Sequence, residues 1–123
     1  MRNKDIPEPN QNTYEEKPTC PIIYALDIIG QKWKIPIMWH LAEQEAIRYN
    51  ELKRSVPGIT NIMLTKSLQE LEEHKLVNRV QYDTIPTKVQ SSLTERGNML
   101  IPVWDKFHMW GEAQIKLYKS DYS

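Results

Sequence analysis

A run of polar side chains between residues 60 and 69 offers hydrogen-bonding groups with little net charge. Asn61, Thr65 and Gln69 carry amide and hydroxyl groups, and Lys66 adds one cation. In the major groove of DNA, Asn and Gln match the edge of adenine, Lys matches guanine, and the methyl group of Thr can contact that of thymine. These residues are therefore candidates for reading base edges. The alternative is an ordinary solvated helix surface.

To read base edges, these polar side chains must lie on one face of a helix. The spacing of the leucines predicts a helix that starts after Thr60. Leu64, Leu68 and Leu71 recur at intervals of four and three, which places them on one buried face. Thr60 is a good N-cap residue, and the pair at 57–58, Pro-Gly, enforces a turn just before it. The residues of this helix that we expect to contact DNA are Thr60, Asn61, Ile62, Met63, Thr65, Lys66 and Gln69.

Two helices and a short strand are predicted before this turn. The segment at 20–30, CPIIYALDIIG, has the apolar spacing of a short amphipathic helix. The next segment, WKIPIMWHLAEQ, predicts a central helix that begins near Lys32, because Pro36 is tolerated only in a first turn. Residues 47–49 predict a short strand, and Asn50 is the predicted cap of the brief helix that follows it.

After the leucine-rich helix the hydrophobic period changes from 3.6 residues to two, which predicts a hairpin. Val80 and Tyr82 alternate with polar residues, as do Val89 and Leu93, and residues 83–87 separate the two runs. We expect two antiparallel strands joined by this loop.

The last helix is expected to begin at a Thr94 cap and to kink at Pro102. It carries Trp104, Phe107 and Trp110, which give more aromatic surface than a small domain readily buries alone. A symmetric pair of chains would bury that surface. The alternative is that the rings cover the core of a single chain.

Helix, helix, tight turn, helix and hairpin is the order of a winged helix-turn-helix, so the predicted fold class is mainly α with a small β-hairpin. The third helix can then lie in a DNA major groove, with the hairpin beside it as a wing. Sixteen basic and sixteen acidic residues cancel overall, yet from Arg48 to Lys66 four basic residues stand against one acid. Basic groups near the turn can bind phosphates. The predicted backbone and wing contacts are Asn50, Lys53, Arg54, Arg79, Thr87 and Lys88.

The length of 123 residues fits one domain. We expect a flexible N-terminal arm over 1–19, a folded domain over 20–118 and a tail over 119–123. No apolar run approaches the roughly 20 residues of a membrane span, and no secretion leader is recognisable, so a cytoplasmic protein without membrane contact is predicted. The single cysteine excludes a disulfide framework within one chain.

An enzyme finds little support in the sequence. The three histidines are widely separated, and no metal-ligand spacing or Gly-rich phosphate loop is present. We therefore expect no catalytic residues, no metal and no cofactor. A winged helix that contacts proteins without binding DNA is the alternative function, which zero net charge permits.

Four stretches carry a family resemblance. They are CPIIYALDIIGQKW, YNELKRSVPGIT, LTKSLQELEEHKLV, and SLTERG followed by IPVWDKFHMWGE. Together they resemble the HxlR family of bacterial winged-helix regulators, relatives of the MarR type, over residues 20 to about 114. The resemblance implies a homodimer that binds pseudo-palindromic operators in double-stranded DNA as a repressor or an activator. It also implies dimer contacts from the first and last helices, here Ile22, Ile23, Leu26, Trp104, Phe107 and Trp110.

The resemblance further implies a regulatory role for Cys20. Family members with a cysteine at this place often use it to sense oxidants or electrophiles. Its position before Pro21, at a helix N-terminus, favours the reactive thiolate. Oxidation of one thiol per chain would give an intersubunit disulfide, a mixed disulfide or an adduct, and a small molecule or an oxidant is the expected effector. A structural cysteine is the alternative.

The sequence departs from the family pattern at three places that bear on function. Lys75 stands where the family usually has Gly, so the helix C-cap there is either strained or ordinary. Residues 90–91, Gln-Ser, replace an acid-aromatic pair in the second wing strand. The third helix begins Thr60-Asn61 where Ser-Pro is usual, so the operator sequence of relatives does not transfer.

Overall fold

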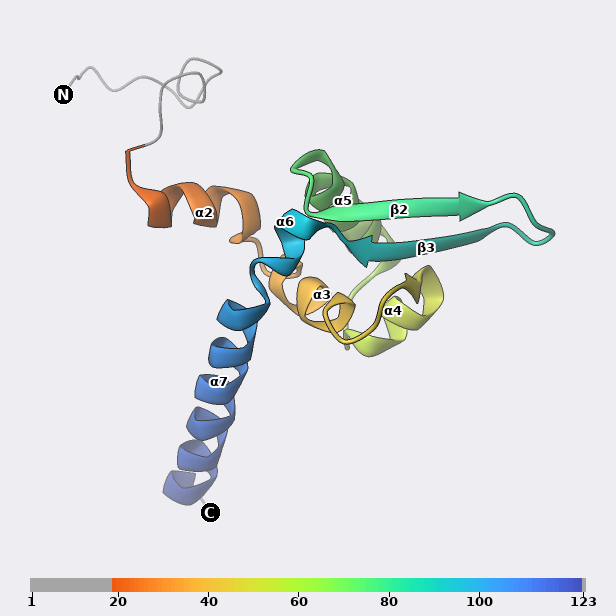
Figure 1. Ribbon diagram of the computed structural model, residues 1–123. Helices are drawn as coiled ribbons and strands as arrows, with labels where there is room; N and C mark the ends of the chain where they lie inside the picture. The colour runs from red at the N-terminus through yellow and green to blue at the C-terminus, as the bar shows by residue number, and fades with distance from the viewer. Residues whose placement is uncertain (1–18, 123) are drawn as a thin grey trace.

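The structure is a computed structural model that describes residues 19–122. The elements are α2 (Pro21–Ile29), α3 (Lys34–Leu41), β1 (Ile47–Arg48), α4 (Tyr49–Ser55), α5 (Asn61–Glu73), β2 (Val77–Tyr82), β3 (Lys88–Leu93), α6 (Glu95–Asn98) and α7 (Ile101–Tyr122). In Figure 1 the wing hairpin extends to one side of a small body, and α7 projects from that body as a long arm. The predicted fold class is confirmed. The predicted arm lies almost wholly outside the described residues.

The core forms where α3 crosses α5. Ile37, Met38 and Leu41 of α3 are fully buried, as its apolar composition on nearly every side requires. The α5 leucines at positions 64, 68 and 71 have no exposed surface, so the predicted leucine face is confirmed. This packing fixes α5 through one face and leaves its other face outward.

The start of α3 lies two residues later than predicted, and the cap of α4 lies two residues earlier. The α3 helix begins at Lys34 instead of Lys32, which still places Pro36 in the first turn, where its missing N–H costs nothing. The prediction that Asn50 caps α4 is wrong. Strand β1 runs directly into α4, so the extended backbone of Arg48 forms the cap and Asn50 lies inside the first turn.

The sheet has three antiparallel strands in the order β1-β3-β2. Strands β2 and β3 form the predicted hairpin, with Val77 opposite Leu93 and Tyr82 opposite Lys88. Strand β1 pairs with β3 and places Ile47 opposite Ser91. Both residues are buried, so Ser91 fills an inward position of the wing strand with a small side chain.

The end of α5 settles the alternatives left open for Lys75. The Leu76 N–H donates to the Leu71 carbonyl at 2.9 Å, and the Lys75 N–H donates to the Glu72 carbonyl at 3.0 Å. This pair of bonds is a Schellman cap, and its left-handed residue is Lys75, with φ 66. A side chain in this conformation costs about 1 kcal/mol that glycine avoids. The cap is therefore strained.

The prediction of one long terminal helix starting at Thr94 is wrong. Thr94 caps the short helix α6, with its Oγ1 accepting from the Gly97 N–H at 3.0 Å and donating to the Lys75 carbonyl at 2.6 Å. Gly97 packs so closely on the residue before β2 that a Cβ there would stand 2.4 Å from the Leu76 carbonyl oxygen. This contact holds α6 against the sheet, and the chain turns before α7 begins. Pro102 lies in the first turn of α7 and kinks nothing.

Candidate nucleic-acid interface

The outward face of α5 carries most of the predicted base-reading residues. Five of them line one shallow depression of about 400 Å³: Asn61, Ile62, Thr65, Lys66 and Gln69. Thr65 is half-buried and the other four are exposed. The polar groups lie opposite the buried leucines, so a partner can reach them without disturbing the core.

The other two predicted residues lie at the start of the helix. Thr60 caps α5, because its Oγ1 accepts a hydrogen bond from the Met63 N–H at 3.1 Å. Met63 is 37% exposed and does not line the depression. The remaining N–H groups of the first turn have no intrahelical partner, and such groups suit a phosphate oxygen.

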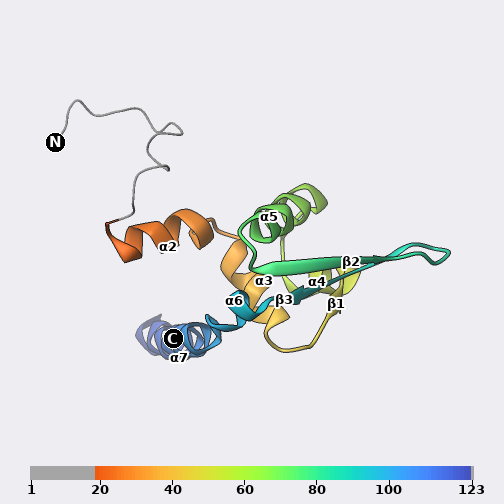
Figure 2. The ribbon, with the colours of Figure 1, turned by 45° about the horizontal axis from the view of Figure 1, so that its top comes forward.

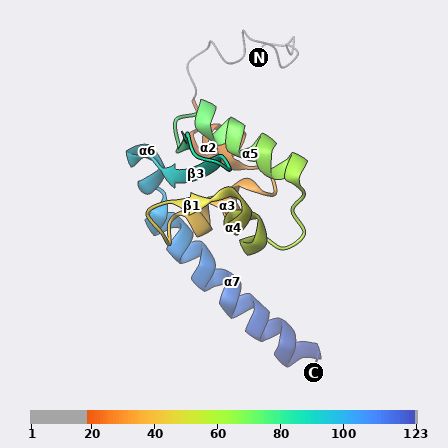
Figure 3. The ribbon, with the colours of Figure 1, turned by 90° about the vertical axis from the view of Figure 1, so that its right-hand side faces the viewer.

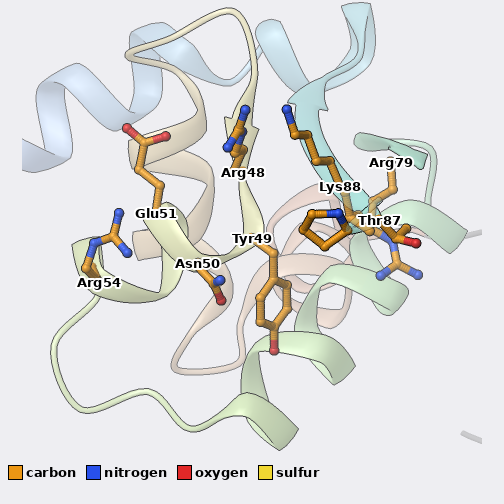
Figure 4. Close-up of a pocket in the computed structure, with 10 residues that line it drawn as sticks. Arg48, Tyr49, Asn50, Glu51, Arg54, Arg79, Thr87 and Lys88 are labelled. Atoms are coloured by element: carbon orange, nitrogen blue, oxygen red, sulfur yellow. The ribbon is translucent and has the colours of Figure 1, made fainter. Parts of the chain in front are cut away.

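A basic groove lies between α4 and the wing, with a volume of about 840 Å³ (Figure 4). Its cations are Arg48, Arg54, Arg79 and Lys88, and its carboxylate is that of Glu51. Five of the six predicted backbone and wing contacts line it: Asn50, Arg54, Arg79, Thr87 and Lys88. Lys53, the sixth, is on α4 but does not line the groove. The groove therefore concentrates positive charge in a chain whose net charge is zero.

Arg79 has a second role besides lining the groove. Its Nε donates to Glu72 Oε1 at 3.1 Å, which ties β2 to the last turn of α5. Both side chains are partly exposed, so the pair itself adds little stability. The bond orients the guanidinium, and the Glu72 carboxylate offsets part of its charge.

Sequence reasoning missed two residues of this surface, Arg48 and Tyr49. Arg48 is exposed in the groove and is one of its four cations. The Tyr49 hydroxyl lies 3.1 Å from the Asn61 backbone oxygen, 3.3 Å from Asn61 Oδ1 and 3.0 Å from Thr65 Oγ1. The local charge count contained Arg48. No local signal marks Tyr49, because its partners belong to a different helix.

An ion pair between the buried Lys34 and the partly exposed Glu70 was also missed. The Lys34 side chain is 3% exposed, and its Nζ lies 2.9 Å from Glu70 Oε1. The same ammonium donates to the Ile28 carbonyl at 3.0 Å. Hydrogen bonding from Lys34 lowers the pKa of Glu70 below its ordinary value, although burial acts in the opposite direction. The pair thus joins the end of α2 and the start of α3 to α5. Lys34 precedes the buried Ile37 by one helical turn, and that spacing indicates a buried side chain but not its partner.

The predicted dimer residues divide into two groups. Ile22, Ile23 and Leu26 on α2 are all exposed, and Phe107 and Trp110 on α7 are 56% and 63% exposed. Helices α2 and α7 both lie away from the wing tip in two views (Figures 1 and 2).

Trp104 differs from the other five predicted dimer residues, since it is 3% exposed and packs in the core of its own chain. The alternative prediction, a ring that covers the core of a single chain, is therefore the correct one for Trp104.

Cys20 is exposed and occupies the N-cap position of α2, directly before Pro21. Its side chain makes no capping hydrogen bond. Within residues 19–122, no group of three or more His, Cys, Asp or Glu side chains is placed to hold a metal ion. No helix in the described part of the chain has the length and apolarity that a membrane span requires.

The side view in Figure 3 shows α5 on one side of the body and α7 running away from it. The outward helix, the basic groove and the hairpin together define a winged helix-turn-helix domain. Comparisons with known proteins give the family.

A sequence profile described as HxlR-like helix-turn-helix matches residues 28–119. The chain is 40% identical over 110 residues to the HTH-type transcriptional regulator YybR of Bacillus subtilis. The matched region covers 89% of this chain and 87% of YybR. The redox regulator HypR in its reduced form is similar with a TM-score of 0.74 and 40% identity, over 82% of this chain and 99% of that one. Diamide-treated YodB from B. subtilis is similar with a TM-score of 0.61 and 30% identity, over 77% of this chain and 94% of that one.

The chain belongs to the HxlR family, which confirms the resemblance found in its sequence. The family and these relatives are transcriptional regulators and not enzymes.

Proposed function

We propose that the chain acts as a homodimer on pseudo-palindromic operator DNA, as a repressor or an activator. In this proposal α5 enters the major groove, and the basic groove between α4 and the wing binds the phosphate backbone. The observation that carries it is the position of Asn61, Lys66 and Gln69 on an exposed helix face beside four cations. A major groove about 12 Å wide accepts such a helix.

The two parts of the surface have different tasks. Side chains on α5 choose among base edges, since amide and ammonium groups there can bond to donors and acceptors that differ between base pairs. Groove cations bind phosphates, which are the same in every sequence, so they raise affinity without selecting. Each phosphate contact also releases counterions, which makes binding fall as salt rises.

Binding of wild type and variants to duplex DNA at several salt concentrations tests this division. We expect Lys66→Ala to weaken binding about tenfold and to change the preferred sequence. Arg54→Ala should weaken binding to all duplexes alike and lower the salt slope by about one. Lys53→Ala is a matched comparison, because it removes a charge from the same helix outside the groove, and its effect should be smaller.

Weak binding by the wild type that does not depend on salt would contradict the proposal and favour a protein-interaction module instead. Identical sequence profiles for the Lys66 and Arg54 variants would contradict the division between bases and phosphates.

The exposed apolar residues of α2 and α7 support the homodimer. Helix α7 is 22 residues long, and a free helix with this much apolar surface gains little stability by itself in water. A two-fold symmetric pair would cover Phe107 and Trp110 and present two copies of α5 to DNA. Two half-sites of an operator lie one helical turn, about 34 Å, or a multiple of it apart.

We further propose that Cys20 makes operator binding respond to oxidants or electrophiles. The thiol is exposed at the N-terminus of α2, a proposed dimer helix, so a change there acts on the subunit contact. HypR is described as a redox regulator with an oxidised and a reduced form, and YodB as diamide-treated. When two Cys20 thiols form a disulfide bond, they give two electrons and two protons to diamide, which is reduced to a hydrazine.

Operator binding and intact mass should be measured for wild type and Cys20→Ser with and without diamide. We expect a disulfide-linked pair and at least a tenfold change in operator affinity for wild type, and neither change in the variant. A variant that responds as the wild type does would remove Cys20 from the mechanism.

A further inference from the structure

We infer that the Tyr49 hydroxyl orients the Asn61 amide and so helps determine which base edge α5 accepts. The inference rests on the proposed function, because it assumes that the outward face of α5 meets DNA. Tyr49 is a positioning residue in this scheme, and Asn61 is the residue that touches the base.

Tyr49 connects the two parts of the interface. It is the first residue of α4, and it lines the basic groove (Figure 4). Its hydroxyl lies next to Asn61 and Thr65, which line the depression on α5. One side chain thus reaches from the proposed phosphate site to the proposed base-reading face.

The hydrogen-bonding capacity of the phenol restricts its neighbours. A Tyr hydroxyl has one proton to donate and two lone pairs that accept. The backbone oxygen and the Oδ1 of Asn61 both lie within reach of that one proton, at 3.1 and 3.3 Å. The Thr65 hydroxyl, at 3.0 Å, can donate to a lone pair of the phenol. In this arrangement Oδ1 of Asn61 faces the hydroxyl, and the amide NH₂ group is turned away from it.

The orientation of the amide decides what Asn61 offers to DNA. An exposed NH₂ group is a donor and matches the acceptors of the major groove, namely N7 of the purines, O6 of guanine and O4 of thymine. Cytosine presents an amino donor there, which an amide NH₂ group cannot accept. We therefore expect the base opposite Asn61 to be any base except cytosine, with a purine preferred for its N7.

Tyr49→Phe removes the hydroxyl and keeps the ring, which packs against the core. Without the hydroxyl the Asn61 amide can turn over, and its oxygen can then accept from the cytosine amino group. A role in packing alone would change the thermal stability and leave the sequence profile as it was. The sequence profile is thus the measurement that separates positioning from packing.

The test is selection of bound fragments from random duplex DNA by the full chain, for wild type, Tyr49→Phe and Asn61→Ala. Tyr24→Phe is the matched control, because it removes one exposed hydroxyl from α2, far along the chain from α5. In Tyr49→Phe, cytosine should become accepted at one position of each half-site, and the ratio of specific to random affinity should fall about fivefold to tenfold. Asn61→Ala should lose preference at the same position, and the Tyr24 variant should match wild type.

A Tyr49→Phe profile equal to that of the wild type would overturn the inference, as would equal losses at every position. A double variant, Tyr49→Phe with Asn61→Ala, should lose no more than Asn61→Ala alone, and a larger loss would also count against it. Failure of the proposed function looks different, because the wild type itself would then select no sequence.

Discussion

Glu70→Gln is expected to lower the free energy of unfolding by about 2–4 kcal/mol, since it leaves the buried Lys34 ammonium without its charged partner. Lys34 is the first residue of α3, so its positive charge also lies at the positive end of that helix. The Ile28 carbonyl still accepts from the ammonium, but it carries no full charge to compensate it. Urea unfolding of the two proteins measures the difference.

Glu70→Gln should also change how the free energy of unfolding depends on pH in the acid range. Because the pKa of Glu70 is lowered in the folded state, its contribution to stability is present above its ordinary value and is lost as the pH falls through the lowered value. Glu70→Gln removes this contribution. The wild type should therefore lose stability below pH 4.5 more steeply than the variant does.

Two matched variants distinguish the loss of the Lys34–Glu70 ion pair from the general effect of removing one charge. Glu72→Gln removes a carboxylate paired with the partly exposed Arg79, and should cost less than about 1 kcal/mol. Lys34→Met removes the buried charge and keeps an apolar stem, so it should cost less than Glu70→Gln. Equal costs for the Glu70 and Glu72 variants would show that Lys34 does not depend on its partner.

Predictions that rested on local pattern were confirmed where one element decided the outcome. Leu64, Leu68 and Leu71 have helical spacing, and a helix with that spacing must turn one side inward. The Thr60 cap needs only the backbone of its own first turn. The face of α5 followed from the same periodicity, because residues opposite a buried stripe are exposed.

Two predictions failed because contacts between elements decided the outcome. The last two helices are separate because Gly97 approaches the carbonyl of Leu76, a residue far away in the chain. Nothing in the local sequence distinguishes this from a helix that continues to Pro102. The cap of α4 was misplaced because β1 supplies an extended residue at Arg48, and this is fixed by pairing with β3.

In the candidate interface, too, residue types could be predicted from the sequence, whereas contacts between elements could not. Three of the four groove cations were predicted by residue type, but only the packing of the wing against α4 brings Arg79 and Lys88 to the same place as Arg54. Tyr49 and Lys34 act through partners on α5, so their roles could not be predicted without the tertiary structure. Trp104 was grouped with Phe107 by residue type, although its burial within one chain separates the two.

Trp110→Ala is expected to raise the dissociation constant of the proposed dimer about a thousandfold. A well-buried aromatic residue at an interface contributes about 2 kcal/mol or more, and a two-fold axis makes each ring count twice. Trp110 is 63% exposed on α7 and shares its apolar stripe with Phe107, so the chain itself loses little packing when the ring is removed. Sedimentation equilibrium over a range of concentrations measures the constant.

Loss of the dimer should also change DNA binding in a defined way. A single chain contacts one half-site and about half the phosphates, so the salt slope should fall to about half and operator affinity by at least about a hundredfold. Lys116→Ala is the matched control, because Lys116 is exposed and its helical position is on the other side of α7. This variant should have the dimer dissociation constant and the salt slope of the wild type. A Trp110→Ala protein that stays dimeric at about 1 μM, with an unchanged salt slope, would place the subunit contact elsewhere on the chain.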